Sequence, residues 1–210
     1  MNFITQLSGW ADGTQNASPA ASHGRSVPFD KSYMKRISLL LLAFNLGHTI
    51  TYSQTVLPDS ILAKTVNEQG REMCRLMLLK DYKAYIKYIN KATIDIAGSE
   101  EKAIELLKNG MTRFESQGYV IINFSIQTPE KFIRVNNEIQ CTLVEDVELK
   151  MPKGKMIAHS PLIGISINDG NNWTFFATSG KDLKTLQKTI PTLSDKLIIP
   201  ETQPFTIVQD

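Results

Sequence analysis

Apolar residues recur at every second position over much of the C-terminal half of this chain, which is the pattern of β-strands with one buried face. Turn-forming sequences separate the runs: Asn136-Asn137 precedes the second, Met-Pro-Lys-Gly the third and Asp-Gly-Asn-Asn the fourth. We therefore predict consecutive antiparallel strands, with a short hairpin strand at 132–135 that turns on the two asparagines. The four longer runs cover residues 119–127, 138–150, 155–168 and 173–178.

The predicted strands differ in whether one or both of their faces carry apolar residues. Residues 119–127 are apolar on both faces, which predicts a strand that is central or covered on both sides. Residues 138–150 have one apolar face, which carries Ile139, Cys141, Leu143, Val147 and Leu149. In the next strand we expect a β-bulge at Ser160-Pro161, because proline has no N–H for the ladder. We expect the inward row of that strand to be Ile157, His159, Ile163, Ile165 and Ile167.

Helical spacing dominates the chain upstream of the strands. A stripe at three- and four-residue steps begins after Asp59, and a second stripe follows a bend near Asp81. A third helix is predicted between Ser99, a suitable N-cap, and Gly118, a suitable C-terminal residue. The three apolar faces are Ile61, Leu62, Val66, Met73, Cys74 and Met77; Tyr82, Tyr85, Ile86 and Ile89; and Ala103, Ile104, Leu107, Met111 and Phe114.

The order of the elements predicts the fold class. Helices come first and strands follow without returning helices between them, apart from one short helix at 181–189. This order favours an α+β fold, in which N-terminal helices pack on a curved antiparallel sheet. It does not favour an α/β fold with a parallel sheet.

The first 53 residues do not resemble the rest of the chain. Met34-Lys35-Arg36 is followed by a short apolar run and by small residues at Thr51 and Ser53, as in a secretory signal peptide. The apolar run is too short to span a bilayer, which takes about 20 residues. We expect residues 34–53 to be the signal peptide, residues 1–33 to be a disordered leader that is not native, and residues 54–210 to form a single domain. The expected location is the periplasm or the outside of the cell.

Charge and cysteine content limit the partners and the covalent links that we expect for this protein. Residues 54–210 contain equal numbers of basic and acidic residues, so they lack the positive charge that favours nucleic acid or an anionic membrane. No cysteine follows the apolar run, so a lipoprotein anchor is not expected. Cys74 and Cys141 fall on predicted apolar faces and are expected to be free buried thiols. A disulfide between them remains an open alternative in an oxidising compartment.

Motifs for metal or nucleophilic chemistry are missing from residues 54–210. They contain one histidine, His159, whereas zinc and iron sites take three or four ligands. Neither a G-x-S-x-G nucleophile elbow nor a phosphate-binding glycine loop occurs. We therefore expect no metal, no cofactor and no assigned catalytic residue. Ser166-x-Asn168-x-Gly170-x-x-Trp173 resembles a single aspartate-box hairpin, which we interpret as structural.

The chain resembles the nuclear transport factor 2-like superfamily in the order of its elements and in three stretches of sequence. These are Asp81-Tyr82-x-x-Tyr85-x-x-Tyr88, Ala97-Gly98-Ser99-Glu100-Glu101 and the Ser166–Trp173 hairpin. The resemblance covers roughly residues 58–200 and is closest to uncharacterised exported bacterial members. It implies a cystatin-like cone, in which a curved antiparallel sheet encloses helices. The superfamily includes isomerases, dehydratases, ligand carriers and interaction modules, so the resemblance does not choose a function.

The function that we expect is non-catalytic binding of an unknown small apolar ligand, or of a protein, in a pocket between the sheet and the helices. The first alternative is a small isomerase or dehydratase that uses Asp95 or His159 as acid or base. The second is a structural module that forms a homodimer through the open sheet face. The predicted pocket residues are Met73, Met77, Tyr82, Tyr85, Phe124, His159 and Trp173.

Overall fold

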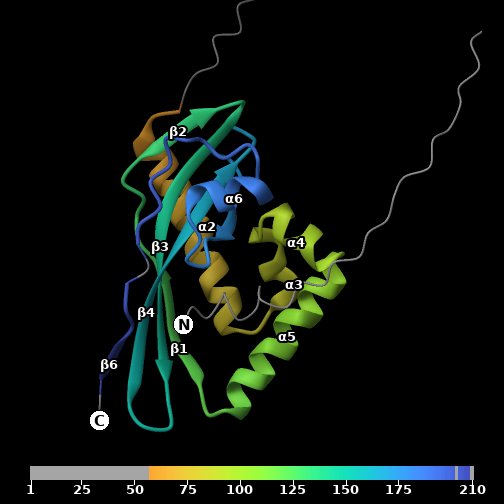
Figure 1. The fold of residues 1–210 in the computed structure, drawn as a ribbon, viewed down its shortest axis with the longest axis vertical. Helices are drawn as coiled ribbons and strands as arrows, with labels where there is room; N and C mark the ends of the chain where they lie inside the picture. Colours follow the sequence, from red (N-terminus) through yellow and green to blue (C-terminus); the bar gives the residue numbers. More distant parts are fainter. Residues whose placement is uncertain (1–56, 202, 209–210) are drawn as a thin grey trace, which may run out of the picture. The chain divides into compact units, whose positions relative to one another are not determined.

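The computed structural model of the protein describes residues 57–201 and 203–208. In these residues helices lead into a curved six-stranded antiparallel sheet, which confirms the predicted α+β class (Figure 1). The predicted leader (1–33) and signal peptide (34–53) lie outside the described residues. The elements are α2 (Asp59–Leu78), α3 (Tyr82–Tyr85), the 3₁₀ helix η1 (Ile86–Tyr88), α4 (Lys91–Ala97), α5 (Glu100–Ser116), β1 (Val120–Ile126), β2 (Phe132–Val135), β3 (Glu138–Lys150), β4 (Lys155–Ser166), β5 (Thr174–Ala177), α6 (Leu183–Thr189) and β6 (Thr206–Val208).

The two longest strands, β3 and β4, form the centre of the sheet and pair from Ile139 to Lys150 along the whole of β4. Strands β1 and β2 pair with different stretches of β3, and β5 and β6 pair with different stretches of β4. The prediction that the first strand is central or doubly covered was therefore wrong, because β1 lies at an edge and exposes Val120 and Ile122. A register shift in β1 falls between Ile121 and Asn123.

The predicted β-bulge at Ser160-Pro161 was also wrong, because the register between β3 and β4 is unbroken there. Pro161 lies opposite Val144, whose carbonyl oxygen accepts a hydrogen bond from the backbone N–H of Gln127. The backbone of Val144 thus faces the β1 side, and the nitrogen of Pro161 faces away from β3. A proline at this position therefore removes no hydrogen bond between the two central strands.

Local sequence signals place the turn between β2 and β3 and both ends of α5 where they were predicted. Asn136 and Asn137 have φ values of 49° and 62°, as the two-residue turn between β2 and β3 requires. The Ser99 hydroxyl accepts a hydrogen bond from the Lys102 N–H at the start of α5, and Gly118 follows the helix with φ 83°. These positions fix where the helices end and the sheet begins.

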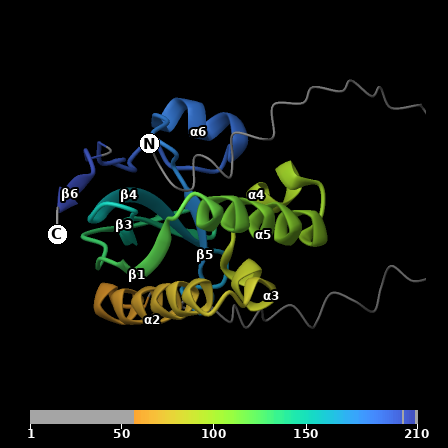
Figure 2. The same ribbon diagram turned by 90° about the horizontal axis from the view of Figure 1, so that it is seen from below.

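Helices cover both faces of the sheet: α2 packs on one face and α6 on the other (Figure 2). The larger hydrophobic cluster lies on the α2 side. The smaller cluster contains Ile163 and Ile165, so the inward row predicted for β4 faces α6 and not α2. Two residues predicted on apolar faces are exposed, Ile61 to 43% and Ile167 to 77%.

A buried glutamine on β3 forms hydrogen bonds with the segment that follows α6. Gln140 lies on β3, is fully buried, and donates hydrogen bonds to the Thr192 carbonyl and to a carboxylate oxygen of Glu138. Its own carbonyl oxygen accepts a hydrogen bond from the Ser194 N–H. The side chain is therefore satisfied, which is the condition under which a buried amide is tolerated.

The hairpin that ends in Trp173 joins the sheet to α2. The indole N–H donates to the Gly170 carbonyl at 3.0 Å and to the Thr65 hydroxyl at 3.1 Å. The backbone N–H of Trp173 donates to the Gln69 side chain, also on α2. At Gly170, φ is 85° and an added Cβ would lie 2.3 Å from Leu62, so the turn needs glycine. These contacts support the structural interpretation of the hairpin.

Candidate functional site

The candidate site lies in the larger hydrophobic cluster, between α2 and the inner face of the sheet. Alternation along β3 turns residues 141, 143, 145, 147 and 149 toward α2. Helix α2 comes close to the sheet at Gly70, where an added Cβ would meet the Ile126 side chain on β1. Beyond the end of α2, the Asp81 side chain accepts the Ala84 N–H and starts α3, which places Tyr85 over the same cluster.

One member of this inward row is not apolar. Glu145 is 1% exposed, and neither of its carboxylate oxygens has a hydrogen-bond partner. It lies opposite Ile126 on β1 and Ser160 on β4. Burial, and to a smaller extent the nearby charge of Asp146, raise the pKa of this carboxyl from 4.5 to about 8. The group is therefore mainly protonated at neutral pH.

The titratable groups on the helices facing Glu145 are Cys74 on α2 and Tyr85 on α3. Burial raises the pKa of both groups, and the charge on Glu145 contributes to each shift. Within the described part of the chain, no lysine or arginine contributes to the pKa of Glu145. The arrangement thus holds three weak acids in neutral form inside an apolar cluster.

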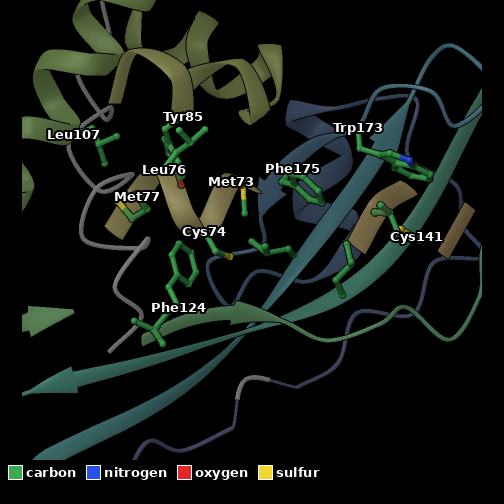
Figure 3. Packing of buried hydrophobic residues seen from close by; sticks show 14 of the residues in the cluster. Met73, Cys74, Leu76, Met77, Tyr85, Leu107, Phe124, Cys141, Trp173 and Phe175 are labelled. Carbon is green, nitrogen blue, oxygen red and sulfur yellow. The ribbon is translucent and has the colours of Figure 1, made fainter. Parts of the chain in front are cut away.

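Six of the seven predicted pocket residues belong to this cluster. Met73, Met77, Tyr85 and Phe124 lie toward one end, and Trp173 lies at the other end beside Cys141 (Figure 3). The sixth, Tyr82, is buried in the same cluster, and burial raises the pKa of its hydroxyl. The residues that the structure brings together are thus mainly those of α2, α3 and β1.

His159 is not brought together with the other six. It pairs across the strands with Asp146, the neighbour of Glu145 on β3, and the two side chains lie on the opposite face of the sheet. The Nδ1 atom of His159 is 2.6 Å from a carboxylate oxygen of Asp146. The Gln127 amide donates to both oxygens of that carboxylate. This small polar group is half-buried.

Asp95, the other residue of the predicted acid–base pair, lies on α4 and is exposed. Its carboxylate accepts hydrogen bonds from the Lys91 ammonium one turn earlier on the same helix. Asp95 and His159 therefore have separate partners on separate elements, and the structure shows no shared site for them.

Glu145 was missed by the sequence analysis, although a signal was present. Its position is the gap in the inward apolar row of β3, between Leu143 and Val147. A charged residue in phase with a buried row is rarely buried unless it is paired. The alternation along residues 138–150 therefore left two interpretations: either the predicted inward row is wrong, or Glu145 is a buried charged residue.

Other predicted features concern cysteines, metals and membranes. Cys74 and Cys141 are free and buried, as expected. Among residues 57–201 and 203–208, no cluster of three or more His, Cys, Asp or Glu side chains is arranged to hold a metal ion. In the same part of the chain, no helix combines the length and apolarity needed to cross a membrane.

Comparisons with protein families, with curated proteins and with solved structures found no match to this chain.

Proposed function

We propose that the protein is an exported, non-catalytic binding domain that holds a small, mostly apolar ligand between the sheet and helices α2 and α3. The observation that carries the proposal is Glu145, a buried carboxyl group without a hydrogen-bond partner. Such a group lowers the stability of the fold. Proteins keep destabilising residues mainly where function needs them. A ligand that bonds to the carboxyl would supply the missing partner.

The surroundings of Glu145 suit an apolar ligand that has one polar group. Ligand sites are mostly apolar with a few placed polar groups, which is the composition found here. The side chains now pack against one another, so a ligand must part them. Met73 and Met77 are buried there, and methionine side chains are flexible and adapt to irregular shapes.

The short helix α3 covers the end of the site that holds Tyr85. It has four residues, of which Tyr82 and Tyr85 are buried, and α4, which follows it, contributes no fully buried residue. The segment is attached to β5 through Asn90, which donates from its backbone to Phe175 and from its amide to Thr174. Segments with few buried side chains open at low free-energy cost. Opening of α4 would loosen α3, and this supports access to Glu145 at the end of the cluster that Tyr85 covers.

Native mass spectrometry tests the binding function. Protein purified under non-denaturing conditions from the cells that make it is expected to carry one small molecule, which is released on denaturation. Glu145→Met, prepared in the same way, is expected to lose most of this retained mass because the polar partner is gone. Circular dichroism would verify that the variant is folded. Wild-type protein that is consistently empty would contradict the proposal.

Export is tested by the mass of the product. If residues 34–53 act as a signal peptide, the protein recovered from the periplasm or the medium should begin near Gln54. Substituting Leu40 and Leu41 with arginine should stop export, because the apolar run would be broken. A recovered product that retains residues 2–33 would contradict the export proposal and leave the binding proposal intact.

A further inference from the structure

The chemistry around Glu145 narrows the kind of ligand, and this step rests on the proposed binding function. Glu145 offers two unpartnered oxygen atoms inside an apolar cluster. The titratable neighbours on the facing helices, Cys74 and Tyr85, are neutral at pH 7, and Asp146 lies on the other face of the sheet. Ile126 and Ser160, directly opposite on the neighbouring strands, are not titratable.

A cationic ligand fits this site poorly. An ammonium group would convert Glu145 to its charged form and bury an ion pair, and both charges would lose their hydration. Its remaining N–H groups would then need acceptors, which an apolar cluster does not supply. A neutral carboxyl group, in contrast, has an O–H that donates and a carbonyl oxygen that accepts. It is matched by a ligand group that also donates and accepts.

We infer that the site takes a neutral amphiphile whose polar end both donates and accepts a hydrogen bond, such as a primary amide or an alcohol, with the protonated carboxyl of Glu145 as its partner. The apolar part of the ligand lies among Met73, Met77, Tyr85 and Phe124. Binding is then linked to a proton on Glu145. The affinity falls when that proton is lost, since a carboxylate cannot donate.

The sign of the pH dependence separates this ligand class from a cationic one. The pKa of Glu145 is raised to about 8, so the carboxyl is mostly protonated at pH 6.5 and mostly ionised at pH 9. Affinity for a neutral donor–acceptor ligand should fall about tenfold between these pH values. Affinity for an amine, which stays mostly cationic at pH 9, should instead rise over the same interval.

Isothermal titration calorimetry with three probes of equal chain length tests the inference: octanamide, octan-1-ol and octylamine. For wild-type protein, octanamide and octan-1-ol are expected to bind more tightly than octylamine at pH 6.5 and to weaken about tenfold by pH 9. Glu145→Gln keeps a donor group and an acceptor but does not titrate. It should bind octanamide equally at both pH values. Glu145→Met should bind octanamide about tenfold more weakly than wild type at pH 6.5, because one hydrogen-bonded pair is lost.

Three results would overturn the inference in different ways. Tighter binding of octylamine, strengthening toward pH 9, would show a binding domain for cations. Octanamide binding that is unchanged in Glu145→Met would show that the ligand lies elsewhere in the protein. No binding of any probe at either pH, in protein that circular dichroism shows to be folded, would contradict the inference, and the proposed function would be contradicted as well only if the native protein also retains no small molecule.

Discussion

Replacing Glu145 with methionine is expected to raise the free energy of unfolding by about 3 kcal/mol at pH 7. Burial raises the pKa of this carboxyl from 4.5 to about 8, so the folded state binds its proton more tightly than the unfolded chain does. The unfolded chain therefore gains by ionising as the pH rises above 4.5. Each pH unit in that interval costs the folded state about 1.4 kcal/mol. Methionine has a similar length, suits the apolar surroundings and does not titrate.

The pH dependence gives a second measure of the same effect. Below pH 4.5 the Glu145 carboxyl is protonated in both the folded and the unfolded state. As the pH rises from 4.5 toward 8, the carboxyl ionises in the unfolded chain only, and the free energy of unfolding falls. The difference between Glu145→Met and wild type should therefore widen over this interval and level off at about 5 kcal/mol. Urea unfolding at several pH values measures it. Because other groups titrate in both proteins, only the difference between the two curves is interpreted.

Glu148→Met is the matched control, on the same strand. Glu148 is partly exposed and forms an ion pair with Lys155 at 3.2 Å, so its replacement should change stability by less than about 1 kcal/mol. A loss of stability in Glu145→Met, or a difference that does not grow with pH, would mean that the Glu145 carboxyl has a partner in solution.

Trp173→Ala is expected to lower the free energy of unfolding by about 3–5 kcal/mol. The indole ring is 1% exposed and packs against Phe132, with ring centroids 5.9 Å apart. Its removal leaves a large cavity and takes away the donor to Gly170 and Thr65. Chemical denaturation followed by circular dichroism measures the loss.

Trp173→Phe separates packing from hydrogen bonding at this position. Phenylalanine keeps most of the ring contact but leaves the Gly170 carbonyl and the Thr65 hydroxyl without the indole donor, at a cost of about 1–3 kcal/mol. If Trp173→Ala costs no more than Trp173→Phe, ring packing is not the main contribution of this residue.

The hairpin and helix ends were predictable because their causes are local. Asn136-Asn137 tolerates positive φ values, and Ser99 can accept a backbone hydrogen bond wherever a helix follows it. The face toward which a strand points is not a local property. His159 lies on the same face of β4 as Ile163 and Ile165. That face packs against α6, whereas α2 covers the opposite face, and the local sequence does not show which helix covers which face.

The two buried polar residues of β3 were not predicted for the same reason. Gln140 falls in the polar row of the strand, and it is buried only because residues 192 and 194 pass over it. Glu145 falls in the apolar row, where it contradicts the pattern. The alternation of polar and apolar residues thus predicted the strand and its phase. It could not predict which segments, distant in the sequence, cover each face.

The arrangement of two hydrophobic clusters on one sheet has a consequence for unfolding. Strand β4 supplies Leu162 to the larger cluster and Ile163 and Ile165 to the smaller one, and it pairs along its whole length with β3, which supplies the larger cluster. Both clusters therefore lose part of their packing if these two strands separate. The two clusters therefore form one cooperative unit, although their residues do not mix. Ionisation of Glu145 beneath α2 weakens the support for α6 as well, because both helices depend on the same pair of strands.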